Sequence, residues 1–351
     1  MRAPILRGLL FYTNDQGVGS HFCYIHRMLY AAVKVMARLA LPLFARRIVI
    51  TNPERLQTGG PLLLAVNHPN SFLDAILLGA YMRYPVHFIT RGDVFKKAWV
   101  RRFLKWLNMI PIYRIRDGKE MLSLNEQTFR QGVDVLYKGG ILLIFVEGFC
   151  ENQTTLQLPL KKGGPRMLQA CWQMGVPAKV LPVWLQYSSF NRFGKTIHIR
   201  LGEVFDHQVC DDPSSAACLT AINTETAKQL QALEHSMPFV HAAPPAWQRG
   251  LLALPALLGA VLHAPLYLPV SWFSAAVSRN NVHYDSILLA VLFALYPLLL
   301  LAVAGWLWAI SGDWLFLPLV LLGMPALAWC FVRWRSDDTM HEGGHSHQAA
   351  V

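Results

Sequence analysis

His68 and Asp74 are the two residues of this sequence whose types and spacing best suit acid–base chemistry. They lie in a polar segment, residues 66–74, that follows an apolar run and opens a stretch with a helical pattern. The turn after a strand is where α/β proteins usually place ligands and catalytic groups. Histidine is a general base near neutral pH, and a carboxylate behind it fixes its tautomer and stabilises the imidazolium. The pair therefore indicates a general base with its supporting carboxylate.

The same residues also have a purely structural interpretation. Ser71 and Asp74 have the spacing of a helix capping box, in which each side chain satisfies a backbone N–H at the start of the helix. A carboxylate is also favourable at the positive end of a helix. On the local sequence alone, both interpretations stay open.

Three further blocks follow the His68 segment in order, and any one of them alone would be weak evidence. They are Gly92–Phe95 together with Ile110–Arg114, then Phe145–Gly148, then Leu181–Val183. The four ordered blocks, spread over residues 28–205, resemble those of the glycerolipid acyltransferases, the PlsC-like family. That family includes the 1-acylglycerol-3-phosphate and the glycerol-3-phosphate acyltransferases.

This sequence departs from the family pattern at three places. Five residues, rather than four, separate His68 from Asp74. Because a helix turns about 100° per residue, we expect the insertion to be absorbed before the helix, near Pro69-Asn70. Val146 replaces the usual proline. Phe149-Cys150 stand where an arginine often follows, and a second base that would make Cys150 a nucleophile is not evident nearby.

The resemblance implies direct acyl transfer without a metal or cofactor. His68 would accept the proton of an acceptor hydroxyl, Asp74 would steady the imidazolium, and a backbone N–H near Gly148 would stabilise the oxyanion.

The other residues of the expected site would bind substrate. Arg114 would grip the phosphate of the acceptor together with Lys161 or Lys162, because a guanidinium binds phosphate in a bidentate manner. A solvated loop explains the two lysines equally well. Glu147 would hydrogen-bond the acceptor or hold the site together.

The resemblance also sets the expected partners. The donor would be acyl-CoA or acyl-carrier protein, and the acceptor a glycerophosphate or lysophospholipid. Conversion of 1-acylglycerol-3-phosphate to phosphatidic acid in phospholipid biosynthesis is the first expectation, and glycerol-3-phosphate or another lysolipid is the alternative acceptor. A hydrolase, or a non-enzymatic membrane protein that binds lipid through a degenerate site, would be the rival functions.

Composition favours a membrane protein. Hydrophobic residues make up 54% of the chain, charged residues only 15%, and the formal net charge is +11. Soluble domains carry about 25% charged residues, so the excess apolar content indicates lipid contact, and the positive charge suits anionic headgroups rather than nucleic acid. The six scattered cysteines have no CxxC spacing, which predicts reduced, buried thiols.

Short apolar runs alternate with helical stretches from residue 51 to 206, which predicts an α/β acyltransferase domain with a largely parallel sheet. Strands are expected at 61–66, 86–90, 110–114, 140–146, 178–185 and 196–201. Residues 1–50 form an expected N-terminal membrane-associated segment, helical from about 24 to 50, with Pro42 ending or kinking the helix near Leu41. Residues 207–248 are a polar connector.

Residues 249–335 form the expected membrane region, followed by a flexible tail, 336–351. Charge-free runs at 287–310 and 314–332 are long enough to span a bilayer, and the turn between them lacks lysine and arginine. Residues 251–277 are also charge-free but contain three prolines. Two spans with an interfacial or re-entrant 251–277 keep Arg249, Arg279, Arg333 and Arg335 on one side. We therefore expect an integral protein of a bacterial inner membrane with its catalytic domain in the cytoplasm.

Overall fold

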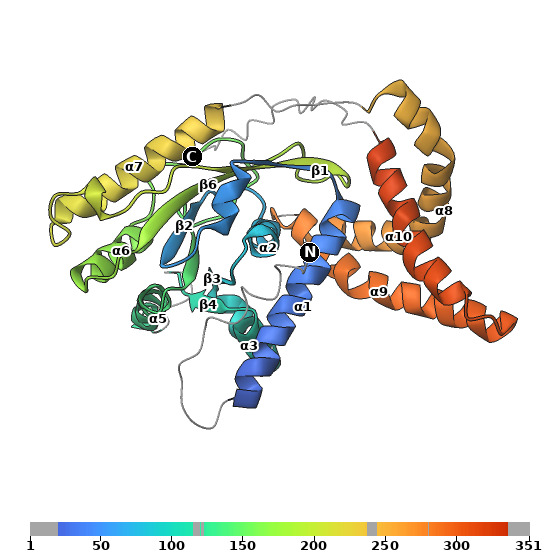
Figure 1. Ribbon diagram of the computed structural model, residues 1–351, viewed down its shortest axis with the longest axis horizontal. Helices are drawn as coiled ribbons and strands as arrows, with labels where there is room; N and C mark the ends of the chain where they lie inside the picture. Colours follow the sequence, from blue (N-terminus) through green and yellow to red (C-terminus); the bar gives the residue numbers. More distant parts are fainter. Residues whose placement is uncertain (1–19, 115–119, 121–122, 237–243, 280, 336–351) are drawn as a thin grey trace, which may run out of the picture.

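A seven-stranded sheet forms the centre of the protein (Figure 1). The computed structural model describes residues 20–114, 120, 123–236, 244–279 and 281–335. The strand order is β1-β7-β6-β2-β5-β3-β4. The strands are β1 (Ala45–Thr51), β2 (Leu62–Val66), β3 (Val86–Arg91), β4 (Met109–Ile112), β5 (Ile141–Phe145), β6 (Lys179–Tyr187) and β7 (Lys195–Leu201).

The five strands from β6 to β4 run parallel to one another, while β7 is antiparallel to β6 and β1 pairs parallel with β7. The predicted α/β class with a mostly parallel sheet is confirmed. All five residues of β2 are buried, as expected for a strand that is covered on both faces. Because β2, β3, β4 and β5 are parallel, their carboxyl ends meet at one edge of the sheet.

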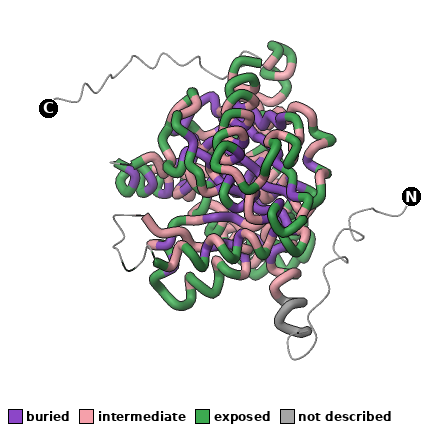
Figure 2. Tube along the Cα trace, turned by 90° about the vertical axis from the view of Figure 1, so that its left-hand side faces the viewer, coloured by how far each residue is buried: buried purple, intermediate pink, exposed green. Residues whose placement is uncertain are grey.

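Helices cover both faces of the sheet. On one face lie α1 (Ser20–Phe44) and α2 (Phe72–Tyr81), whose apolar residues pack with Leu62, Leu64 and Val66 of β2. On the other lie α5 (Asn125–Tyr137), α6 (Gly163–Gln173) and α7 (Ala216–His235), which pack with Leu63 and Ala65. Figure 2 shows the buried residues concentrated in the interior and the exposed residues on the outer helices.

The remaining elements of the domain are short. Helix α3 (Ala98–Trp106) carries basic residues and precedes β4, and 3-10 helices occupy Pro53–Gln57, Gly92–Phe95 and His207–Val209. Most predicted elements are present within a few residues of their expected bounds.

The prediction that the N-terminal helix continues to about residue 50 is wrong. Helix α1 continues through Pro42 and ends at Phe44, and residues 45–51 form the edge strand β1. The β-branched run Ile48–Thr51 suits a strand, and its partner β7 lies about 150 residues away, so the pairing is not visible in the local pattern. Along α1, Tyr30, Ala37 and Leu41 are buried, whereas Met28, Val35 and Leu39 are exposed. This exposed apolar side agrees with the predicted membrane association, which stays a prediction.

Three helices near the C-terminus are long and apolar enough to cross a membrane. They are α8 (Ala246–Val277), α9 (Tyr284–Ser311) and α10 (Phe316–Trp334). Helix α8 contains Pro255, Pro265 and Pro269 and changes direction along its length (Figure 1). The prediction that only the last two segments span the bilayer stays a prediction.

Close contacts join the three helices to one another and to the sheet. A side chain at Gly259 of α8 would meet the carbonyl oxygen of Leu327 of α10 at 2.4 Å, so glycine permits this close approach. At the end of α10, Arg46 donates a hydrogen bond to the carbonyl of Arg335 (3.3 Å), and Arg335 donates to the carbonyl of Phe193 (3.3 Å). These bonds place the end of α10 against the sheet, while the turn between α9 and α10 lies away from it (Figure 1).

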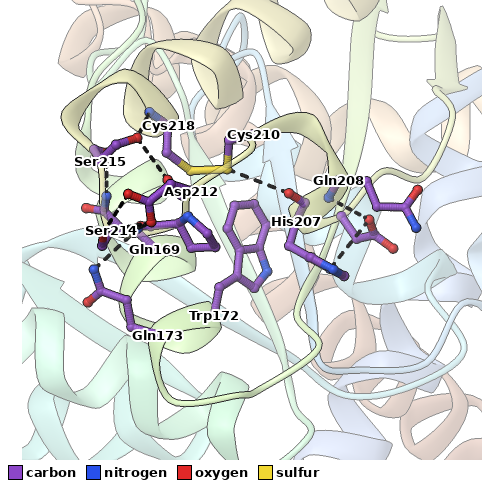
Figure 3. Close-up of a disulfide and its surroundings, with 12 residues drawn as sticks. Gln169, Trp172, Gln173, His207, Gln208, Cys210, Asp212, Ser214, Ser215 and Cys218 are labelled. Atoms are coloured by element: carbon purple, nitrogen blue, oxygen red, sulfur yellow. Dashed lines mark hydrogen bonds and ion pairs between the residues drawn. A yellow bond between two sulfur atoms is a disulfide. The ribbon is translucent and has the colours of Figure 1, made fainter.

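The prediction that the cysteines are reduced is wrong for one pair, because Cys210 and Cys218 form a disulfide (Figure 3). Ser215 caps α7 by accepting a hydrogen bond from the Cys218 N–H (3.2 Å). The turn before this cap brings the two Cα atoms to 5.1 Å, which suits a disulfide. Cys171 is a buried free thiol, as predicted.

Candidate active site

His68 and Asp74 are in direct contact at the carboxyl end of β2. The His68 Nδ1 atom lies 2.9 Å from Asp74 Oδ2, and the Asp74 side chain is fully buried. Since Nδ1 faces the carboxylate, Nε2 is the ring nitrogen that remains for a substrate proton. The imidazole is 17% exposed, so the ring is accessible from outside.

The extra residue between His68 and Asp74 is absorbed before the helix. Helix α2 begins at Phe72, and Ser71 has a positive φ of 53° that turns the chain into the helix. The Asn70 N–H donates to Asp74 Oδ2 (2.8 Å), which holds the turn against the carboxylate. Ser71 makes no side-chain cap to any residue that the structure describes, so the capping-box interpretation is wrong.

Tyr187, at the end of β6, donates a hydrogen bond to the other carboxylate oxygen, Asp74 Oδ1 (2.5 Å). The Tyr187 side chain is buried, and burial together with the negative charge of Asp74 raises its pKa well above the ordinary value. The phenol is therefore protonated and acts as a donor. With Tyr187, Asn70 and His68 around it, Asp74 is held by groups from two strand ends and one turn.

Two further contacts fix His68 itself. Its backbone N–H donates to Glu147 Oε2 (2.7 Å), and its ring stacks on Phe145, with centroids 3.5 Å apart and planes 9° apart. Both partners come from the end of β5, the strand next to β2. The orientation of the ring is thus set from its backbone, its face and its Nδ1 atom.

Glu147 is almost fully buried and braces the loop after β5. Its Oε1 accepts hydrogen bonds from the Gln157 N–H (2.9 Å) and from Gln153 Nε2 (3.0 Å). Burial raises the pKa of this carboxyl, while the donated hydrogen bonds oppose that shift. Of the two roles expected for Glu147, the contacts favour holding the site together.

The Gly148 N–H donates its hydrogen bond to the carbonyl of Phe145 (3.1 Å). The Gly148 N–H itself is therefore not available to an oxyanion, and the expectation of a backbone donor near Gly148 stays a prediction. Gly148 instead permits a turn with φ of +73°, and a Cβ there would meet Lys161 Cγ at 2.7 Å. The Lys161 stem therefore packs directly over Gly148.

Basic side chains line the same edge of the sheet. The Lys161 N–H donates to the carbonyl of Val146 (2.8 Å), which places Lys161 at the end of β5. Arg91 ends β3 and pairs with Asp93 (2.5 Å), and Arg114 follows β4 with its Nη2 3.6 Å from the same Asp93 oxygen. The guanidinium of Arg91 lowers the pKa of Asp93. Three cationic groups thus lie at the edge that carries His68.

The structure also shows where Lys162 and Cys150 lie. Lys162 is exposed at the N-cap of α6, one residue beyond Lys161. The Cys150 sulfur accepts a hydrogen bond from the Ser71 N–H (3.0 Å), and burial raises the pKa of its thiol. A protonated, buried thiol is a poor nucleophile, so Cys150 does not fit that role.

Comparison with known proteins supports an assignment for this region. Residues 47–186, which contain His68, Asp74, Arg114 and Glu147, match the family model described as Acyltransferase. The match spans 140 of the 351 residues, from within β1 to near the end of β6. The domain is also similar to a 1-acyl-sn-glycerol-3-phosphate acyltransferase of Bacillus subtilis (strain 168), with 26% identity over 132 residues.

That alignment covers 37% of this chain, and the chain spans 61% of the length of the Bacillus relative. Among solved structures, the chain is similar to the 1-acyl-sn-glycerophosphate (LPA) acyltransferase PlsC from Thermotoga maritima. The sequence identity is 17%, the TM-score is 0.44, and the match covers 67% of this chain and 89% of that one.

The structure adds residues to the candidate site that were not expected from the sequence. Tyr187 is the last residue of β6 and Arg91 the last residue of β3, so both lie at the edge that carries His68. Their position at the ends of predicted strands is the feature of the sequence that could have identified them. His283, between α8 and α9, lies near the site, where burial and the positive charge of Arg91 lower its pKa. No local pattern in the sequence indicated that His283 lies near residues so far away along the chain.

Proposed function

We propose that this chain transfers an acyl group from a thioester to a hydroxyl of a glycerophosphate-type lipid. The observation that carries the proposal is the 2.9 Å contact between His68 Nδ1 and Asp74 Oδ2 within the acyltransferase-family region. The name of the Bacillus relative supports 1-acylglycerol-3-phosphate as the acceptor, which would make phosphatidic acid the product.

His68 takes the central step. Its Nε2 accepts the proton of the acceptor hydroxyl while the oxygen attacks the thioester carbonyl, and Asp74 stabilises the imidazolium. The tetrahedral intermediate collapses with cleavage of the C–S bond, and the imidazolium returns its proton to the departing sulfur. An ester and a free thiol result, so atoms and charge balance without another reactant.

The phosphate of the acceptor is bound by the cationic edge of the site. Arg114, Arg91 and Lys161 supply the positive charge, and Asp93 holds the two guanidinium groups near each other. Guanidinium groups match the oxygen geometry of a phosphate, so they orient the acceptor as well as attract it. Lys162, one residue further along, adds a more distant positive charge.

The donor is acyl-CoA or acyl-carrier protein, because both present a thioester to the same attack. An apolar groove beside the site is lined by Tyr30, Ala37, Phe72, Ile76 and Phe88, among others. Phe72 opens α2, directly after the turn that carries His68, so an acyl chain in this groove would end near the base. The C-terminal helices hold the domain at a membrane, with the domain on the cytoplasmic side.

The test is transfer by the purified full-length protein in lipid nanodiscs. A labelled acyl thioester of each donor type is supplied with glycerol-3-phosphate, with 1-acylglycerol-3-phosphate, or without acceptor. Labelled phosphatidic acid is expected from the wild type, and His68→Ala should abolish its formation. His235→Ala is the matched control, since His235 is exposed in the last turn of α7. Release of free fatty acid alone would identify a hydrolase, and neither product would leave lipid binding as the function.

A further inference from the structure

The N-terminal end of helix α9 contacts the catalytic turn directly. Asn70 donates a side-chain hydrogen bond to Asp285 Oδ2 (2.7 Å). Ser286 Oγ donates to the carbonyl of Asn70 (3.3 Å) and accepts from the N–H of Leu73 (3.3 Å). These residues are all buried, so the first turn of a candidate membrane helix lies inside the protein against residues 70–73.

Asp285 also forms an ion pair with Lys195 of β7, and both side chains are completely buried. Burying two charges is costly, and a pair of apolar residues of similar volume is often at least as stable. A buried ion pair is therefore weak evidence for a role in stability alone. The geometry of the pair suits a different role, which is to position the Asn70 side chain. The Asp285 oxygen that pairs with Lys195, Oδ2, is the same oxygen that accepts the hydrogen bond from the Asn70 amide.

Asn70 connects this ion pair to the catalytic carboxylate. Its backbone N–H donates to Asp74 Oδ2, the same oxygen that contacts His68 Nδ1. The next residue, Ser71, has a φ of 53° and ψ of −130°, a region that side-chain-bearing residues rarely adopt. Such a conformation persists only where its surroundings hold it. On one side the turn is held by Asp74, and on the other by Asp285 and Ser286.

We propose that Asp285 is a positioning residue of the active site, and that helix α9 thereby contributes to catalysis as well as to membrane attachment. Asp285, whose charge Lys195 balances, fixes the Asn70 side chain, and the fixed turn directs Asp74 toward His68. This role rests on the proposed acyl transfer. It makes the membrane region part of the catalytic unit, although Asp285 itself does not touch the reacting atoms.

The test uses the full-length protein in nanodiscs and separates positioning from folding. In Asp285→Asn the carbonyl oxygen still accepts from Asn70, but Lys195 loses its counter-charge. We expect kcat to fall between about tenfold and a hundredfold, the range that a displacement of about 1 Å produces, with little change in KM for the acceptor. The double variant Asp285→Asn/Lys195→Met removes the unpaired charge and keeps the acceptor, so most of kcat should return.

Asp313→Asn is the matched control. It makes the same chemical change in the exposed turn at the opposite end of α9, and kcat should stay at the wild-type value. A second control is the background Asp74→Asn, in which Asp74 no longer serves as the supporting carboxylate. There the effect of Asp285→Asn should largely disappear, because the two residues act through one turn.

Alkylation of Cys150 reports the position of the turn without any need for activity. Its sulfur contacts the Ser71 N–H, so release of the turn should speed labelling of Cys150 in Asp285→Asn relative to Cys330 in the same molecule. A kcat within twofold of wild type together with unchanged labelling would overturn the positioning role. The role would also be overturned if Lys195→Met did not restore the kcat of Asp285→Asn and if Asp285→Asn lowered kcat by the same factor in the Asp74→Asn background. If the wild type transfers no acyl group but labelling changes as expected, the contact holds the turn and the proposed function fails.

Discussion

The phenol of Tyr187 and the imidazole of His68 bind opposite oxygens of the Asp74 carboxylate, at 2.5 Å and 2.9 Å respectively. Tyr187 ends β6 and His68 follows β2, and these two strands are neighbours in the sheet. The carboxylate is therefore clamped between two adjacent strand ends. Its orientation toward His68 depends on a residue 113 positions away.

Tyr187→Phe should lower kcat by about tenfold with little change in KM. The substitution leaves Asp74 Oδ1 buried without its donor, and a hydrogen bond to a charged group contributes about 1.5–3 kcal/mol, where about 1.4 kcal/mol is a factor of ten. Steady-state kinetics in nanodiscs measure the effect. Tyr137→Phe, at an exposed tyrosine of α5, is the control. An unchanged kcat would mean that the clamp is not needed for turnover.

His68→Ala and Asp74→Asn should not be additive. Asparagine cannot stabilise the imidazolium and favours the wrong tautomer, so Asp74→Asn alone should lower kcat by roughly 10³–10⁴. Once His68 is absent, Asp74 has no ring to orient, and the double variant should be no slower than His68→Ala. Single-turnover rates with a labelled thioester provide the comparison. Independent, multiplying losses would show that Asp74 acts other than through His68.

The strands, the position of His68 and the turn before α2 could be predicted from the sequence, because each depends on residues that are close together along the chain. The buried strands appear as short apolar runs, and His68 stands directly after one of them, so its place at the sheet edge followed from the pattern. The predicted distortion near Pro69-Asn70 followed from helix geometry, and the positive φ of Ser71 is its structural form.

Other parts of the site depend on tertiary contacts that no local pattern carries. The edge strand β1 exists because β7 pairs with it, and without that partner the segment continues a helical pattern. Asp285 stands at the start of an apolar helix, where a membrane-flanking charge is the ordinary explanation. Only the fold brings it to Asn70 and Lys195.

Arg114→Ala should raise KM for a phosphate-bearing acceptor about tenfold or more and leave kcat nearly unchanged. The guanidinium is proposed to bind a group that does not react, so its loss weakens ground state and transition state equally. With a monoacylglycerol, which lacks the phosphate, wild type and variant should behave alike. Arg130→Ala, at an exposed arginine of α5, is the control. An equal loss with both acceptors would remove the phosphate role.

Glu147 should make the stability of the protein depend on pH. Burial raises the pKa of this carboxyl in the folded state above its ordinary value of 4.5. The stability that protonated Glu147 gives the folded protein is then fully present below the pKa of Glu147 in the unfolded chain. It is lost as the pH rises through the pKa of Glu147 in the folded protein, because the unfolded chain releases its proton first. Melting temperatures in detergent, measured upward from about pH 4.5, should fall more steeply for wild type than for Glu147→Gln. Parallel curves would show that Glu147 titrates normally.

The Cys210–Cys218 disulfide should affect stability and leave catalysis intact. It joins the turn after His207–Val209 to the first turn of α7 (Figure 3). Nearby, Phe205 pairs with Val180 at the start of β6, so this region lies at the sheet edge opposite the end that carries Tyr187. A cross-link closing so short a loop contributes about 2–3 kcal/mol in the chain-entropy view. The double variant Cys210→Ser/Cys218→Ser should therefore melt at a lower temperature than the wild type. Its kcat should stay within about twofold of the wild-type value, because no contact of His68 or Asp74 among the described residues involves this turn. A marked loss of kcat at a temperature where the variant is folded would show that α7 and the active site are coupled.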